Sequence, residues 1–263
     1  MSAWAMKRKV LYFLTLVIII LVIIAFFVWR IFFTRPETCF DRIQNQDEEG
    51  VDCGGVCDLF CSADVIDPIV RFARAVPVTD EVYHVIAQVE NQNIASGIPQ
   101  IPYTFKVYDE KNILIAEKSG VTFLGPNQET LIFLPHIKVG NRLPHFTNLE
   151  VRWSQVPWVD TDEEFSRVQI VVDGLVWERL DTNPKLTAQV QNTTFDPLYD
   201  MEFVVAVYDA DGNIMAASNT YLQRLDQGQT KDIFFTWPVP FTAPPAQADV
   251  IPRINPFLEK NQP

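Results

Sequence analysis

The sequence beyond its first sixty residues is most informative in what it lacks. No cysteine follows Cys61, and the whole chain has only three histidines, His84, His136 and His145. It contains no G-x-S-x-G, P-loop, G-x-G-x-x-G or H-E-x-x-H motif. Thiol catalysis therefore has no candidate nucleophile there, and we interpret the histidines as surface residues. Two carboxylates from distant strands would leave no motif, so a glycosidase-like activity stays open as an alternative.

Charge is absent between Val10 and Trp29, a run of twenty residues without a charged side chain. An α-helix of that length spans about 30 Å, the thickness of a bilayer's hydrocarbon core. A cleaved signal peptide is the alternative, but the run ends in Phe26-Phe27-Val28-Trp29-Arg30, without the small residues that a signal peptidase needs. We therefore expect a basic stub over 1–9 and an uncleaved, single-pass signal-anchor helix over 10–33.

Acidic residues are absent from the first 35 positions, which carry five basic ones. The other 16 basic residues and all 33 acidic residues lie in 36–263, which gives that part a net charge of −17. The basic residues Lys7, Arg8 and Lys9 before the helix favour a cytoplasmic N-terminus, with 36–263 outside the cell membrane. Such an acidic surface repels nucleic acid, so the expected partners are cationic or bridged by divalent ions.

All four cysteines, Cys39, Cys53, Cys57 and Cys61, lie in a short segment that we call the collar, 36–64. The collar is too small to bury a core, and it would lie in an oxidising compartment, so two disulfides are predicted. Sequence alone does not choose among the three pairings. A four-cysteine zinc site is the rival interpretation, although the spacings of 13, 3 and 3 residues differ from paired C-x2-C knuckles.

The collar resembles a known module. Its pattern Cys39-x-Asp41-x-x-x-Asn45-x-x-Glu48-x-x-x-Asp52-Cys53-Gly54-Gly55-x-Cys57 is similar to the CxDGxxNxxExxxDCGGxC module of bacterial surface proteins, with Arg42 in place of a glycine. The resemblance implies a location outside the cell. The same segment is rich in the hard oxygen ligands that calcium prefers, although no cofactor is required. The candidate ligands are Asp41, Asn45, Asp47, Glu48 and Asp52; the alternative is a solvated acidic loop with local turns.

The rest of the chain repeats itself with an offset of 101 residues. Gln88-Val89-Glu90-Asn91 returns as Gln189-Val190-Gln191-Asn192, and the strand-like segment 103–109 is answered by 203–209. Along 83–89 and 186–190 apolar residues alternate with residues on a second face, which predicts strands with one buried face. Each copy continues through a turn into a return strand. The residues predicted to be buried are Val85, Ala87, Val89, Phe105 and Val107, then Leu186, Ala188, Val190, Phe203 and Val205.

A repeat of this length with short strands predicts a mainly β protein with two tandem antiparallel β-sandwiches. We place the first sandwich at 65–158, an acidic linker at 159–164, the second sandwich at 165–258 and a tail at 259–263. Phe105-Lys-Val107-Tyr108-Asp109 resembles the motif of the FxLYD-type domains of bacterial surface proteins, which are related in style to immunoglobulin-like and late-embryogenesis-abundant sandwiches. That resemblance implies an extracellular sandwich and brings no catalytic residue with it.

These observations predict a membrane-anchored binding or structural protein rather than an enzyme. Its tandem sandwiches would be presented outside the cell for envelope assembly, adhesion or a membrane complex, and it would bind a protein or another envelope component. The alternative is an enzyme or a solute-binding accessory that uses a cleft between the two domains. A deep acidic cleft between the sandwiches would favour the alternative.

Overall fold

The structure, a computed structural model, describes residues 3–33, 38–45, 47–57, 59–61, 64–153, 156–161 and 170–258. Residues 162–164 of the predicted linker and the whole predicted tail, 259–263, lie outside the described residues. The chain divides into two compact units, 1–57 and 58–263, which are described separately. The first holds the helix and most of the collar, and the second holds the antiparallel sheets. The predicted fold class is confirmed.

The single helix of the described residues is α1, Ala3–Phe33. Its segment Leu11–Arg30 has a mean hydropathy of 3.2 and no part of it is buried by the rest of the protein. By length and composition this segment is able to cross a membrane. The helix begins before the apolar run because Met6, Lys7 and Arg8 are good helix formers.

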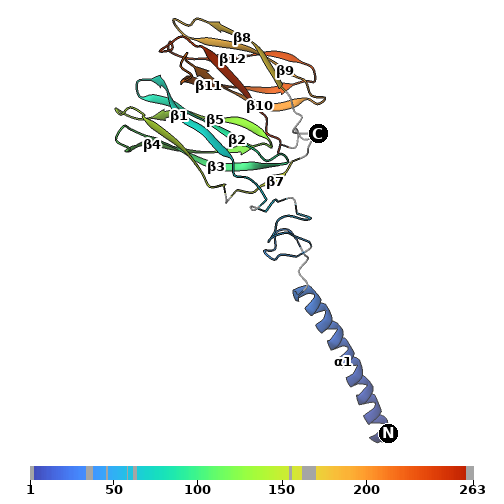
Figure 1. The fold of residues 1–263 in the computed structure, drawn as a ribbon. Helices are drawn as coiled ribbons and strands as arrows, with labels where there is room; N and C mark the ends of the chain where they lie inside the picture. Colours follow the sequence, from blue (N-terminus) through green and yellow to red (C-terminus); the bar gives the residue numbers. More distant parts are fainter. Residues whose placement is uncertain are drawn as a thin grey trace. The chain divides into compact units, whose positions relative to one another are not determined.

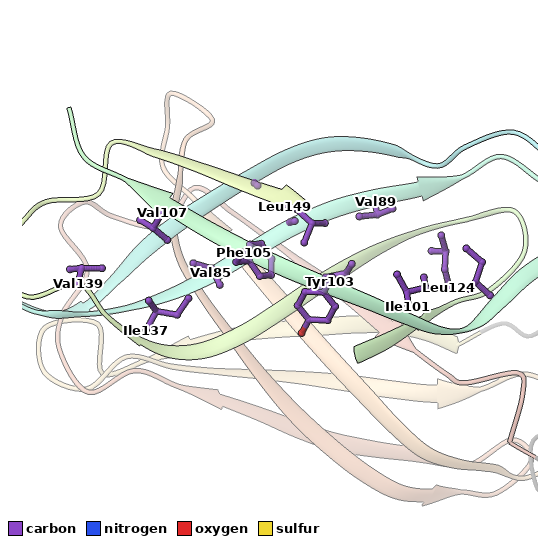
Figure 2. Close-up of a cluster of buried hydrophobic side chains, with 14 of the residues drawn as sticks. Val85, Val89, Ile101, Tyr103, Phe105, Val107, Leu124, Ile137, Val139 and Leu149 are labelled. Atoms are coloured by element: carbon purple, nitrogen blue, oxygen red, sulfur yellow. The ribbon is translucent and has the colours of Figure 1, made fainter. Parts of the chain in front are cut away.

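Two sheets form the first sandwich (Figure 1). One has the strand order β1-β2-β5, with β1 (Ile69–Thr79), β2 (Val82–Asn91) and β5 (Gln128–Lys138). The other has the order β4-β3-β6, with β3 (Ser96–Tyr108), β4 (Leu114–Leu124) and β6 (Phe146–Val151), and β7 (Val159–Asp160) also pairs with β3. Figure 2 shows the apolar side chains that fill the space between these sheets, among them Val85, Phe105 and Leu149.

The second sandwich repeats this topology strand for strand. One sheet has the order β12-β9-β8, with β8 (Ile170–Glu178), β9 (Lys185–Asn192) and β12 (Thr230–Thr236). The other has the order β11-β10-β13, with β10 (Leu198–Tyr208), β11 (Ile214–Leu225) and β13 (Gln247–Arg253). All ten residues predicted to be buried are fully buried, namely Val85, Ala87, Val89, Phe105, Val107, Leu186, Ala188, Val190, Phe203 and Val205.

The two sandwiches stack on each other, so the second unit consists of four sheets in layers (Figure 1). Between the sandwiches, sheet β1-β2-β5 meets sheet β11-β10-β13 through a third apolar cluster. Its fully buried members include Ile86, Val204 and Ala206. The expectation of one buried face was therefore wrong for β2, which is buried on both faces because it lies in an inner sheet; β10 lies in the other inner sheet and is also buried on both faces.

The contact between the sandwiches is heterologous: sheet β1-β2-β5 of the first sandwich corresponds in the repeat to sheet β8-β9-β12 of the second, but it packs against sheet β11-β10-β13. At several positions of the repeat, the copy on an outer face is polar and the copy at the contact between the sandwiches is apolar. Three residues of the inner face of β10 and β13, Val204, Ala206 and Ile251, correspond in register to Thr104, Lys106 and Glu150.

Candidate functional site

In the collar, all four cysteines are in disulfide bonds, as predicted. Cys39 and Cys57 are joined, with their Cα atoms 5.7 Å apart. Cys53 and Cys61 are disulfide-bonded as well, and the chain has no free cysteine. No thiolate is then left to bind zinc, so the predicted disulfides replace the rival zinc site.

The acidic side chains of the collar organise its backbone. Glu48 is buried, and its Oε2 accepts hydrogen bonds from the backbone N–H groups of Asn45 and Asp52, each at 3.2 Å. Both carboxylate oxygens of Asp52 lie 3.0 Å from the backbone N of Arg42. Asp41 accepts from the backbone N of Ile43 at 2.9 Å. These bonds fix a loop that has too few apolar residues to form a core of its own.

Four of the five predicted calcium ligands are thus parts of one hydrogen-bonded loop. Asp41 contacts Asn45 through its second oxygen at 3.0 Å, while Asp47 is exposed and lies at a backbone position with φ of 69°. Within the described residues, one group of at least three metal-ligand side chains is close together, Cys39, Glu48 and Cys57, and two of these form a disulfide. Calcium binding by the collar stays a prediction.

A buried polar network joins the two sandwiches at Arg253, which is 6% exposed. Its Nε donates to Thr130 Oγ1 on β5 at 3.1 Å, and its other guanidinium nitrogens bond Thr122 on β4 and Glu202 on β10. Glu202 also accepts from Tyr221, whose pKa is raised to about 12 by burial and by the Glu202 charge. Sequence reasoning missed this network because nothing local marks an arginine as buried.

An enzyme or a solute-binding accessory would need a cleft between the two sandwiches. In the structure the contact between the sandwiches is filled by side chains. Apolar side chains occupy the centre of the contact between the sandwiches, and Arg253 with its partners closes one part of it. A buried ion pair with several hydrogen bonds fixes one arrangement of the groups that make it. The two sandwiches consequently pack against each other within one compact unit.

An open cleft of about 1030 Å³ lies on the outer sheet β4-β3-β6 of the first sandwich. Its lining combines the aromatic side chains of Tyr103 and Trp153 with polar side chains, namely Thr104, Ser119, Glu150 and Arg152. The Tyr103 ring lies over Gly120, where an added Cβ would come within 2.5 Å of the tyrosine hydroxyl. Burial raises the pKa of Tyr103. Tyr103 is only 5% exposed, so the accessible lining of the cleft consists mainly of polar side chains and the partly buried Trp153.

The two repeated asparagines, Asn91 and Asn192, connect neighbouring loops through side-chain hydrogen bonds, and we call them the latch asparagines. Asn91 Nδ2 donates to the carbonyl oxygens of Ser96 and Gly125, each at 2.8 Å, and Asn192 Nδ2 donates to those of Asp196 and Leu225. Both asparagine side chains are almost completely buried. Burying an amide is tolerable only when its hydrogen bonds are made, so this role explains why both copies keep the residue.

The predicted turns after Tyr108 and Tyr208 are also matched. Asp109 Oδ1 accepts from the backbone N of Ile113 at 2.9 Å, and Asp209 Oδ1 accepts from that of Asn213 at 2.8 Å. These backbone hydrogen bonds, the largest cause in each case, lower the pKa of both carboxyl groups. Both aspartates therefore act as turn-closing residues.

The histidine prediction needs one correction. His84 is not simply a surface residue, because its ring packs edge-on against Phe133 and His136, with centroids 5.0 Å from each. Its Nδ1 accepts a hydrogen bond from the backbone N of His136 at 3.2 Å. Burial, then the nearby charges of His136 and Lys118, lower its pKa to about 4. His84 is thus neutral and structural at ordinary pH.

Comparison with known proteins gives no family assignment. No family model matches the chain, and no curated protein matches it. One similar solved structure is the red sea bream transglutaminase, with 10% sequence identity over 72% of this chain and a TM-score of 0.23. The matched part spans 31% of the length of that enzyme's chain. A similarity of this degree carries no argument about function.

Proposed function

We propose that the chain is a membrane-anchored binding protein of a bacterial envelope, with a cytoplasmic N-terminus and residues 36–263 outside the membrane. It acts in envelope assembly, adhesion or a membrane complex by binding a protein or another envelope component. The apolar helix and the disulfides are features of a secreted or membrane-anchored protein. The bacterial origin rests on the resemblance of the collar and of the FxLYD-like motif.

One observation carries this proposal: the two sandwiches are packed into a single compact unit, with apolar side chains and the Arg253 network filling the contact between them. A compact unit loses little conformational freedom when it binds, which favours recognition of a partner. The alternative, an enzyme or a solute-binding accessory, would use a cleft between the domains. Ile86, Val204 and Arg253 fill that position, which supports the binding function.

Anchoring of the chain in the membrane would increase the apparent affinity of a weak contact between the sandwiches and a partner at the same membrane. The helix confines the sandwiches to one membrane surface, where a second contact gains from a high effective concentration. The net charge of −17 on residues 36–263 favours partners with a basic surface. Binding to such partners weakens as the salt concentration rises.

The test is crosslinking of the full chain in intact cells with a reagent that does not cross the membrane. We expect a reproducible adduct with a defined envelope protein, recovered at lower yield when the cells are treated in high salt. The matched assay offers the purified full chain in detergent a set of glycans, peptides and esters. Turnover that a single carboxylate substitution abolishes would contradict the proposal and favour the enzymatic alternative.

A further inference from the structure

Each sandwich exposes one large apolar residue at the same place in the repeat. Ile94, in the loop between β2 and β3, is 72% exposed, and Phe195, in the loop between β9 and β10, is 87% exposed. The two positions differ by the repeat offset of 101, and each comes three residues after a latch asparagine. Single exposed apolar residues are ordinary on protein surfaces. Their recurrence at equivalent loop positions is the feature to explain.

Both loops are held rigidly in place. In the first, the backbone N of Asn93 donates to Asn91 Oδ1 at 3.0 Å; in the second, the backbone N of Thr194 donates to Asn192 Oδ1 at 2.9 Å. Each loop is also bonded to the turn that precedes β5 or β12, through Asn127 N to Asn93 O and Gly228 N to Asn192 O. The apolar side chains are therefore presented on fixed supports, and little conformational entropy is lost when they are covered.

The two loops lie at the same end of the stacked sandwiches. Asn91 pairs with Gln128 at the start of β5, and Arg253, the last residue of β13, bonds both Thr130, close to that start, and Glu202, in the first half of β10. The loop before β3 spans the two sheets of one sandwich, and the loop before β10 spans those of the other. Because stacked sheets lie about 10 Å apart, the loop centres are separated by two layers, or about 20 Å. That distance fits within one interface of ordinary size, about 800 Å² per partner.

A third exposed apolar residue, Ile66, lies next to the Ile94 loop. Ile66 is 59% exposed, and its backbone is bound by the Asn93 side chain, which accepts from Ile66 N at 2.8 Å and donates to Ile66 O at 2.7 Å. We call the surface formed by Ile66, Ile94 and Phe195 the paired-loop surface.

Carboxylates surround the paired-loop surface. Four of them are exposed and form no ion pair with a basic side chain in the described part of the chain, namely Asp64, Asp67, Asp160 and Asp196. Asp196 follows Phe195 directly, and Asp160 pairs with Ser96 at the end of the Ile94 loop. Two basic residues of the described part of the chain already form ion pairs, Arg71 with Glu90 and Arg224 with Asp226.

The geometry points to the paired-loop surface as the contact for a protein partner that offers apolar pockets within a basic surface. This inference rests on the proposed binding function and names the site and the kind of partner. Apolar side chains at the centre of an interface supply affinity, and complementary charges around them set specificity and the rate of association. A bilayer with anionic headgroups fits less well, because the carboxylates would be repelled. A second copy of the same surface would meet like charge in the same way.

The experiment places a benzophenone amino acid in the full chain, in its native membrane, at position 94, 195 or 143. Leu143 is the matched control, because it is 73% exposed in the loop between β5 and β6, at the opposite end of the first sandwich. We expect positions 94 and 195 to crosslink the same protein through peptides rich in lysine or arginine, and position 143 not to. In the chain labelled at position 94, Phe195→Ser should lower the yield about tenfold. Leu143→Ser should leave that yield unchanged.

Four results would overturn the inference: equal adducts from position 143, adducts with phospholipid, a yield that Phe195→Ser does not change, or a yield that salt does not change. Because Phe195 is exposed, its replacement should leave the thermal midpoint of the protein unchanged, so a loss of crosslinking is not a loss of folding. Protein adducts formed only from position 143 or from the outer cleft would overturn this inference and leave the proposed binding function standing. Catalytic turnover without any protein adduct would count against both.

Discussion

Replacing Arg253 by alanine is expected to cost about 3–5 kcal/mol of unfolding free energy, the usual result of breaking a buried ion pair. The substitution removes the bonds to Thr122 and Thr130 on the first sandwich, and it leaves Glu202, only 14% exposed at its side chain, without its cation. Small proteins have a total stability of about 5–15 kcal/mol, so this loss is large. Because the network crosses between the sandwiches, the loss should affect both of them.

The repeat provides a matched control for this substitution. Arg152 stands at the equivalent position of the first sandwich, on its outer face, and is exposed. Arg152→Ala is expected to change stability by less than about 0.5 kcal/mol, as surface substitutions do. The two variants thus delete the same side chain at equivalent positions of the repeat, one buried with several partners and one exposed.

The assay is urea unfolding of the full chain in detergent micelles, followed by far-ultraviolet circular dichroism and by tryptophan fluorescence. Both sandwiches contribute to the tryptophan signal, since Trp158 is buried in the core of the first and Trp237 in that of the second. We expect one transition by both probes, shifted to lower urea by Arg253→Ala with the slope unchanged. Two separated transitions, or a shift as small as that of Arg152→Ala, would refute the account of one compact unit.

Four further substitutions test the core packing, the buried histidine and the two latch asparagines. Phe203→Ala should cost about 3–5 kcal/mol in the same urea assay, because the ring is fully buried; a loss below about 1 kcal/mol would contradict its place in the core. His84 has its pKa lowered to about 4, so its contribution to stability is present above pH 6.5 and is lost as the pH falls from 6.5 to 4. His84→Gln should therefore flatten the decline of the urea midpoint over that window, and an unchanged slope would count against the buried, neutral ring. Asn192→Ala and Asn91→Ala should each lower the unfolding free energy by about 1–3 kcal/mol, since buried carbonyl groups lose their donors. Urea midpoints equal to that of the wild type for both variants would contradict this role.

Much of the fold was predictable because it depends on local patterns. Alternation along 83–89 and 186–190 identified the inward faces of β2 and β9, and the 101-residue offset showed that the two sandwiches share one topology. The cysteine cluster identified the disulfide-bonded collar. These features follow from strand periodicity and from the inability of a short segment to bury a core.

The contact between the sandwiches was missed, although the sequence carries a signal for it. Phe203-Val-Val-Ala-Val207 is a continuous apolar run, typical of a strand that is buried on both faces, whereas Phe105-Lys106-Val107 alternates. Comparing the two copies position by position would have shown Val204 against Thr104 and Ile86 against Thr187. The partners of Arg253 were not predictable, because they come from strands far apart in the sequence.

The paired-loop surface was also missed. Exposed apolar residues in loops have no periodicity, and Ile94 and Phe195 are informative only once their loops are known to lie at one end of the molecule. The signal available in the sequence was the repeat itself, which aligns a large apolar residue with another three positions after the asparagine.

The central claim is that α1 anchors the chain with residues 36–263 outside the cell. It is tested by protease treatment of intact cells or protoplasts that make the full chain with a tag at each end. The account predicts that the sandwiches and the C-terminal tag are digested, while the N-terminal tag stays protected inside the cell and the helix fragment stays with the membrane after alkaline extraction. Complete protection of the C-terminal part together with an accessible N-terminal tag, or release of the full chain from the membrane by alkali, would contradict it.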